Sequence, residues 1–219
     1  MRERGLRRLL RYGAMALVVN AGMGTAMAEA APIRLLALGD SLTAGYGLAP
    51  EDAFPVRLQR ALRAEGWEIE VINAGVSGDT AADGRARLDW ALAAKPDAAI
   101  VEFGANDALR GLDPDATDAN LDAILTRLER DRLPVLLAGM LAPPNLGRDY
   151  TDRFRATFTR LTKAHDVVFY PFFLDGVAAH PEMTLPDGLH PSPRGVATIV
   201  AAILPSVRQL LGRVRPGPP

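Results

Sequence analysis

The sequence predicts an α/β fold in which a mostly parallel β-sheet carries helices on both faces. Short apolar runs of strand length alternate along the chain with segments of helical spacing, and this alternation is typical of strands joined by crossover helices. The chain has 219 residues without an internal repeat or a shift in composition, a length that suits a single α/β domain. We therefore expect one domain over residues 31–212.

Five apolar runs are the expected strands. They cover residues 33–38, 68–72, 98–103, 134–140 and 167–170. Between the third and fourth runs, four apolar residues follow the spacing i, i+3, i+4, i+7 that is typical of one helix face. These residues are Leu121, Ile124, Leu125 and Leu128.

The C-terminal part of the chain predicts a long connection followed by a helix. About twenty residues between Tyr170 and Pro193 carry no clear element, and loops of that length are usually functional or disordered. A helix is expected from Pro193 to Leu211, because proline suits a first helical turn. Residues 213–219 end in RPGPP, which cannot continue the helix, so we expect a loose tail.

Residues 1–28 have the order of a secretory signal peptide. Residues 1–11 hold five arginines and one acid, residues 12–28 are uncharged, and Ala26-Met-Ala28 and Ala28-Glu-Ala30 have the small-x-small form of a cleavage site. The alternative is a membrane anchor, but residues 12–28 are short for a span and contain Asn20. We expect cleavage near residues 28–30, a periplasmic or secreted protein, and no stable membrane anchor afterwards.

The composition excludes several classes of site. The chain has no cysteine, so disulfides, thiolate nucleophiles and cysteine-bound zinc are excluded. It has three histidines in all, and we expect no metal and no other cofactor. Without the five arginines of residues 1–28, acidic residues outnumber basic ones, so we expect no nucleic-acid partner. The sequence leaves the oligomeric state open.

Polar and small residues follow several of the expected strands. GDS (39–41) follows the first strand, NAGVSGDT (73–80) the second and GAND (104–107) the third, while DGLHPS (187–192) lies in the long segment after the fifth. In open α/β sheets, ligands bind outside the carboxyl ends of the strands. We therefore expect these residues to meet at one edge of the sheet.

Ser41, Asp187 and His190 supply the residue types of a Ser-His-Asp triad. Residues three apart in a turn share a face, so Asp187 can accept a hydrogen bond from one imidazole nitrogen of His190 and leave the other free as a base. His165 and His180 have no such partner at this spacing, and we expect them to be structural or exposed.

A serine nucleophile also needs donors for the oxyanion of its intermediate. The backbone N–H of Ser41, Gly78 and the side-chain amide of Asn106 are placed after successive strands to serve, since glycine lets the backbone approach a ligand closely. For GAND alone, a turn followed by a helix start is the alternative, because Asn and Asp cap helices well.

Other motifs and functions fit the sequence less well. GVSGD (75–79) resembles the G-x-S-x-G elbow but ends in Asp79, and GYGLAP (45–50) lacks the third glycine of a dinucleotide loop. A phosphate-binding loop after the first strand would not explain Asp187 and His190. A metallophosphoesterase is disfavoured by the few histidines. A non-catalytic protein that binds an acyl or glycan ligand on the same fold remains an alternative.

Four short blocks resemble, in order, those of the GDSL, or SGNH, hydrolases. They are GDSLTAGYG (39–47), NAGVSGDT (73–80), GAND (104–107) and DGLHP (187–191). Their context is most similar to the branch of bacterial thioesterase I, lysophospholipases and arylesterases. The resemblance implies a flavodoxin-like three-layer α/β/α sandwich with a five-stranded parallel sheet in the order 2-1-3-4-5, and no metal.

The resemblance also implies roles for single residues. Ser41 is then the nucleophile, His190 the base and Asp187 the acid that orients it. Ser41, Gly78 and Asn106 are then the oxyanion donors. The implied reaction is hydrolysis of small acyl esters or thioesters through an acyl-enzyme, with removal of acetyl groups from sugars as an alternative.

An acyl pocket is expected from the loops after the third and fourth strands. The candidate residues are Leu109, Leu112, Pro143, Leu146 and Tyr150. The alternative for each of them is ordinary loop packing. Acyl chain length and the choice between ester and thioester stay open, because the shape of the pocket decides them.

Overall fold

The computed structural model describes residues 31–215 and Gly217, whose centre is a five-stranded parallel sheet. The strands are β1 (Ile33–Gly39), β2 (Ile69–Gly75), β3 (Ala98–Glu102), β4 (Val135–Ala138) and β5 (Val168–Tyr170). They lie in the order β2-β1-β3-β4-β5, and every neighbouring pair is parallel. The expected strand order is confirmed. The predicted signal peptide, residues 1–28, lies outside the described residues.

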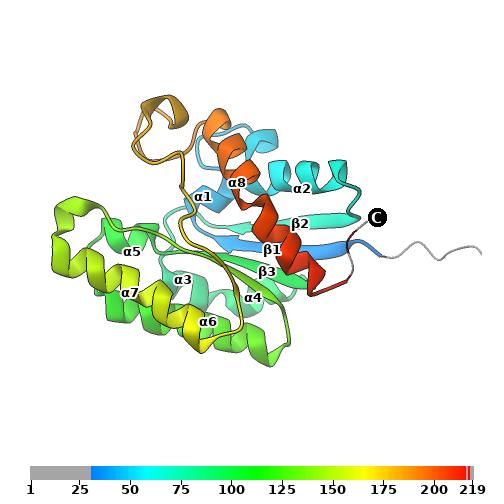
Figure 1. Cartoon of the computed structure of the whole chain (residues 1–219), viewed down its shortest axis with the longest axis horizontal. Coiled ribbons are helices and arrows are strands. Elements are labelled where there is room, and N and C mark those ends of the chain that lie inside the picture. Colours follow the sequence, from blue (N-terminus) through cyan, green and yellow to red (C-terminus); the bar gives the residue numbers. More distant parts are fainter. Residues whose placement is uncertain (1–30, 216, 218–219) are drawn as a thin grey trace, which may run out of the picture. The chain divides into compact units, whose positions relative to one another are not determined.

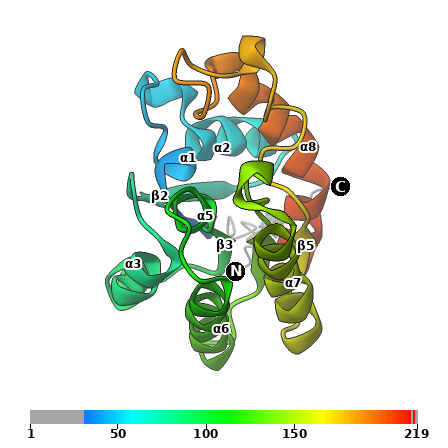
Figure 2. The ribbon, with the colours of Figure 1, turned by 90° about the vertical axis from the view of Figure 1, so that its left-hand side faces the viewer.

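Helices cover both faces of this sheet, which makes the three layers visible in Figures 1 and 2. One face carries α1 (Ser41–Ala44), α2 (Phe54–Ala64) and α8 (Pro193–Gly212). The other carries α3 (Ala81–Ala86), α4 (Leu88–Leu92), α6 (Pro114–Arg130) and α7 (Arg148–Ala164). The short helix α5 (Ala105–Leu109) follows the carboxyl end of β3, and single 3₁₀ turns cover Pro50–Asp52, Pro144–Leu146 and Pro181–Met183.

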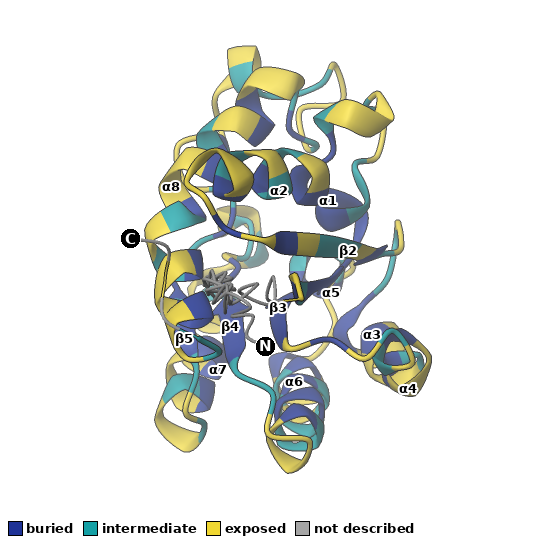
Figure 3. Cartoon of the chain, turned by 90° about the vertical axis from the view of Figure 1, so that its right-hand side faces the viewer, coloured by how far each residue is buried: buried dark blue, intermediate teal, exposed yellow. Residues whose placement is uncertain are grey.

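Burial follows the position of each strand in the sheet. In β3 all five residues are buried, as expected for a central strand covered by helices on both faces. In the edge strand β2, buried and more exposed residues are mixed. The helices turn their buried sides to the sheet (Figure 3), and the four residues of the predicted helix face in α6 are fully buried.

The last helix begins at Pro193, as expected, and the Ser192 side chain caps it by accepting a hydrogen bond from the Gly195 N–H at 3.3 Å. Of the helices in the described residues, α8 alone is long and apolar enough to span a membrane by length and composition. Its apolar face, with Ile199, Ile203 and Val207, is buried in the core. Packing therefore accounts for the composition of α8.

The segment between β5 and α8 is irregular, but backbone hydrogen bonds hold it together. Thr184 and Pro191 form an isolated antiparallel bridge, and the Leu185 N–H donates to the His190 carbonyl at 2.7 Å. This segment brings residues 187–190 back to the carboxyl edge of the sheet.

The described part of the C-terminal tail differs from the loose tail expected for residues 213–219. Arg213 donates to the Asp166 carbonyl at 2.9 Å, and Arg215 donates to the carbonyls of Ala31 and Glu68 at 2.9 and 2.8 Å. Both arginine side chains donate to main-chain carbonyls, and no sequence pattern predicts such hydrogen bonds.

Candidate active site

Ser41 lies in the first turn of α1, directly after β1. The Asp40 carboxylate caps this helix by accepting the Leu42 N–H at 2.9 Å. A Cβ at Gly39 would lie within 2.6 Å of Glu102 Oε2 and would also overlap the Thr43 side chain, so only glycine fits this position. The expected turn after β1 is therefore a helix N-terminus, and it fixes Ser41 at the edge of the sheet.

His190 links Ser41 to Asp187 in one chain of hydrogen bonds. His190 Nε2 lies 3.0 Å from Ser41 Oγ, and His190 Nδ1 lies 2.6 Å from Asp187 Oδ2. An ionised carboxylate only accepts hydrogen bonds, so Nδ1 carries the proton in the neutral imidazole and Nε2 can accept from the serine hydroxyl. The three residues of the predicted triad thus come together in the order that general-base chemistry needs.

Asp187 and His190 are held by the turn that they form. Asp187 Oδ1 accepts the N–H groups of Leu189 at 2.9 Å and of His190 at 3.0 Å. The Leu189 N–H first, and then the His190 imidazole, lower the pKa of Asp187 to about 2. The Tyr46 ring lies against the imidazole, with ring centroids 4.5 Å apart. The turn therefore presents an anionic carboxylate to His190.

Asn106 comes from α5, and its amide nitrogen donates twice. Nδ2 donates to Asp40 Oδ2 at 3.0 Å and to the Asp79 carbonyl at 2.9 Å. GAND is therefore the start of a helix, but its N-cap is Gly104 and no side chain caps it. Asn106 also lines the same cleft as Ser41. Both amide hydrogens have acceptors within the protein, so the orientation of the amide is fixed.

Gly78 lies in the loop after β2 with φ +90°, a left-handed conformation that favours glycine. Its carbonyl accepts a hydrogen bond from Arg110 Nη2 at 2.6 Å. Gly78 does not line the cleft beside Ser41. It is connected to the site through its neighbour Asp79, whose carbonyl holds Asn106.

Two buried acids lie beneath Ser41. Burial raises the pKa of Asp40 to about 6, although the Leu42 N–H and the Asn106 amide favour its charged form. Burial, and then the charge of Asp40, raise the pKa of Glu102 well above its usual range. Glu102 Oε2 accepts the Thr43 hydroxyl at 2.8 Å, and Oε1 has no partner within the described residues. Sequence reasoning missed this acidic pair, because Glu102 stands in an otherwise apolar strand.

An apolar cleft of about 550 Å³ opens beside Ser41, Asn106 and His190. Its walls come from α5, from the loop after β4 and from the segment after β5, including Phe172, Val177 and Leu189. Of the five predicted pocket residues, Leu109 and Pro143 line this cleft.

The other three predicted pocket residues lie outside the lining of this cleft. They are Leu112, Leu146 and Tyr150. The Tyr150 hydroxyl donates to the Leu112 carbonyl at 2.7 Å, so this pair packs loop against helix.

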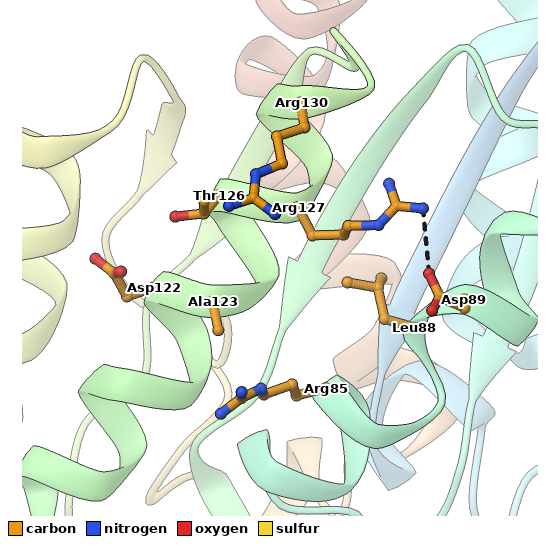
Figure 4. A pocket seen from close by; sticks show the side chains of 8 residues that line it. All are labelled: Arg85, Leu88, Asp89, Asp122, Ala123, Thr126, Arg127 and Arg130. Carbon is orange, nitrogen blue, oxygen red and sulfur yellow. Dashed lines mark ion pairs between the residues drawn. The ribbon is translucent and has the colours of Figure 1, made fainter.

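A second hollow lies between α4 and α6 (Figure 4). Arg127 pairs there with Asp89 at 3.1 Å, and Arg85 and Arg130 also line it. Arg127 and Arg130 belong to the last turn of α6, which leads to the amino end of β4, away from Ser41. This hollow has charged side chains but no serine, cysteine or histidine nucleophile in its lining. Residues 31–215 also contain no group of three or more acids or histidines arranged to hold a metal ion.

The remaining histidines do not join this site. His165 ends α7, and its ring nitrogens lie 2.9 Å from Glu129 and 3.1 Å from Asp122. His180 is exposed and lies 3.6 Å from Glu182. Both arrangements agree with the structural or surface position expected for them.

Hydrogen bonds link a hydroxyl, an imidazole and a carboxylate at the carboxyl edge of the parallel sheet. This arrangement places the protein among hydrolases with a three-layer α/β/α fold. Residues 37–197 match the GDSL-like lipase/acylhydrolase family, and the chain belongs to that family. It is a hydrolase of carboxylic esters or thioesters.

Similar proteins carry names that agree with this class. An arylesterase of Vibrio mimicus is 40% identical over 167 residues, which cover 76% of this chain and 84% of that protein. Esterase TesA of Pseudomonas aeruginosa is 35% identical over 94% of this chain and 100% of its own. The structure of AlinE4, an SGNH-hydrolase family esterase, has 44% identity and a TM-score of 0.71, covering 84% of this chain and 98% of its own.

Proposed function

We propose that this chain hydrolyses small acyl esters and thioesters through an acyl-enzyme formed on Ser41. The hydrogen-bonded chain from Ser41 Oγ through His190 to Asp187, with steps of 3.0 and 2.6 Å, carries the proposal. It has the donor and acceptor order by which a histidine activates a serine and a carboxylate holds the tautomer.

The proposed reaction proceeds in two halves. His190 Nε2 takes the hydroxyl proton as Ser41 Oγ attacks the carbonyl carbon, and the oxyanion lies against the N–H groups of Ser41 and Gly78 and the Asn106 amide. The intermediate expels the alcohol or thiol, which takes the proton from His190. Water then attacks the acyl-enzyme with His190 again as base, and the acid leaves. Asp187, whose pKa is about 2, stays anionic and stabilises the imidazolium.

The apolar cleft supports an acyl or aryl group as the part of the substrate that is bound. Leu109, Pro143, Phe172 and Val177 line it beside Ser41, and apolar walls with few polar groups bind such chains well. The names arylesterase and esterase TesA of similar proteins agree with such substrates. A sugar would leave its hydroxyls without partners on these walls, so deacetylation of sugars is the less favoured activity.

The experiment compares the unmodified protein with Ser41→Ala on p-nitrophenyl esters and acyl-CoA thioesters of graded chain length. We expect kcat to fall roughly 10⁴- to 10⁶-fold, because removing a triad member leaves only binding and oxyanion stabilisation. Ser206→Ala, in α8 and partly buried, is the matched control and should keep full activity. Activity that survives Ser41→Ala, or that disappears with a chelator, would contradict the proposal.

We further propose that the chain is exported to the periplasm or beyond and loses residues 1–28 on the way. The support is the basic, uncharged and small-x-small order of that segment. Expression of the full chain followed by N-terminal sequencing tests this. A mature protein that begins near residues 28–30 is expected, and one that keeps Met1 in the exported fraction would contradict it.

A further inference from the structure

Arg87 lies between α3 and α4, and its guanidinium points inward to the ends of two strands. Nη1 donates to the Ala74 carbonyl of β2 and Nη2 to the Gly39 carbonyl of β1, both at 2.9 Å. Nε donates to Asp79 Oδ2 at 2.5 Å. The Arg87 side chain is 17% exposed, and the Phe103 ring centroid lies 5.9 Å from the guanidinium carbon. A single side chain thus joins β1, β2 and the loop that follows β2.

That loop, residues 76–79, is called the oxyanion loop below because it carries Gly78. Its Val76 N–H donates at 3.0 Å to the Gly39 carbonyl that Arg87 also binds. At its other end, the Asp79 carbonyl accepts one amide hydrogen of Asn106. The oxyanion loop therefore carries the Gly78 N–H and, together with Asp40, holds the orientation of the Asn106 amide.

We propose that Arg87 is a positioning residue for the oxyanion hole, an inference that rests on the proposed function. The guanidinium is planar and presents its donors in a fixed fork. It therefore fixes three acceptors relative to one another: the end of β1, the end of β2 and the Asp79 carboxylate. A lysine ammonium keeps the charge but is a point donor on a flexible stem, so it cannot hold all three acceptors in that geometry.

Arg110 provides a comparison on the outer side of the same loop. It is exposed, and within the described residues its side chain makes one hydrogen bond, to the Gly78 carbonyl at 2.6 Å. A single exposed contact fixes the loop less firmly than three partly buried ones, because water competes for it. Loss of Arg110 should therefore affect turnover less than loss of Arg87.

The test measures kcat and KM of Arg87→Lys on p-nitrophenyl acetate and butyrate. A misplaced oxyanion donor lowers transition-state binding and leaves ground-state binding alone, so we expect kcat to fall roughly 10- to 100-fold while KM changes less than about threefold. Arg110→Gln should lose less than about fivefold in kcat. Arg85→Lys is the matched control, since Arg85 lies two residues away and its guanidinium donates to Asn120 Oδ1. It should behave like the unmodified protein.

Chemical rescue separates positioning from general damage. Ethylguanidinium added to Arg87→Ala should restore at least part of the lost kcat, and ethylammonium should not. A folded Arg87→Lys with kcat within about threefold of the unmodified protein would overturn the inference. A loss of kcat that ethylguanidinium and ethylammonium rescue equally would also overturn it.

A second variant keeps the test decisive if the Arg87 variants do not fold. Asp79→Asn leaves Arg87 its two carbonyl acceptors and weakens only its link to the oxyanion loop, so kcat should fall about tenfold with KM preserved. Unchanged kcat in folded Asp79→Asn would overturn the inference. Ser41→Ala distinguishes the two proposals: if it remains active the proposed function fails, whereas if only the Arg87 and Asp79 variants are normal, only the positioning role fails.

Discussion

Asp40 and Asp187 are two carboxylates near the same serine, and the structure gives them opposite surroundings. Asp40 is fully buried between β1 and α1, and burial raises its pKa to about 6. Asp187 lies in the irregular segment before α8 with 36% of its side chain exposed, and two N–H donors and the imidazole hold its pKa at about 2.

The contrast extends to the regions that carry these acids. The region around Asp40 is part of the regular structure, because polar groups are buried there between strands and helices. The region around Asp187 is a turn whose hydrogen bonds are mostly local. The first region should therefore be sensitive to changes in the core, while loss of the imidazole from the second should abolish activity at little cost in stability.

The largest effect is expected from His190→Ala. The change removes the base, so kcat should fall roughly 10⁴-fold or more. The imidazole belongs to a local turn, so the free energy of unfolding should change by about 1 kcal/mol or less. Ester turnover and urea denaturation measure the two quantities, and the exposed His180→Ala is the control for both. A much larger loss of stability would show that the turn is not local.

A smaller effect, of opposite sign in the two regions, is expected for the pH dependence of stability. The pKa of Asp40 is about 6 in the folded protein and 3.8 unfolded, so the contribution of Asp40 to stability is lost as the pH rises from about 4 to 6. Asp40→Asn lacks this titration, and its unfolding free energy relative to the unmodified protein should rise by up to about 3 kcal/mol between pH 3.5 and 7.

Asp187→Asn is the counterpart of that variant. The lowered pKa of Asp187 stabilises the unmodified protein above pH 4 and is lost as the pH falls toward 2. The unfolding free energy of Asp187→Asn relative to the unmodified protein should therefore fall as the pH rises from about 2 to about 4. Denaturant unfolding of both variants across the pH range is the measurement. If the unfolding free energies of both variants, relative to the unmodified protein, changed in the same direction with pH, the contrast between the two acids would be wrong.

The smallest effect is expected from Leu189→Ala, at the rim of the cleft. Leu189 is 52% exposed, so the free energy of unfolding should stay within about 0.5 kcal/mol. KM for p-nitrophenyl octanoate should rise about two- to fivefold, and that for the acetate should not change, because only the longer chain reaches the rim. Trp90→Ala, 72% exposed on α4, is the control. An equal change for both esters would show that Leu189 acts on the turn instead of on the acyl chain.

Much of the fold follows from the sequence, because its signals are local. Each strand is an apolar run, and the predicted bounds lie within three residues of those observed. Asp187 and His190 could be paired from their spacing alone, since a turn brings them together. The strand order and the choice of Gly78 needed the resemblance to known hydrolases, because neither follows from the periodicity of side chains.

The missed residues are those whose partners are distant or belong to the main chain. Arg87 binds two backbone carbonyls. Because every residue has a backbone carbonyl, the sequence does not indicate which of them an arginine will bind. The wall residues Phe172 and Val177 lie in a segment with no periodic pattern. Tyr150 is aromatic and lies in the expected region, but its hydroxyl donates to the Leu112 carbonyl. The sequence alone does not indicate which side of a loop such a residue faces.

The two acceptors of the Asn106 amide within the protein affect how this amide distinguishes the bound ester from the transition state. Its amide hydrogens are donated to Asp40 and to the Asp79 carbonyl. In the proposed reaction an incoming ester must compete for one of them. A neutral carbonyl oxygen is a weak competitor against a carboxylate, whereas a tetrahedral oxyanion is a strong one. The hydrogen bond would then pass to the substrate mainly at the transition state, and the protein would gain rate without binding its substrate more tightly.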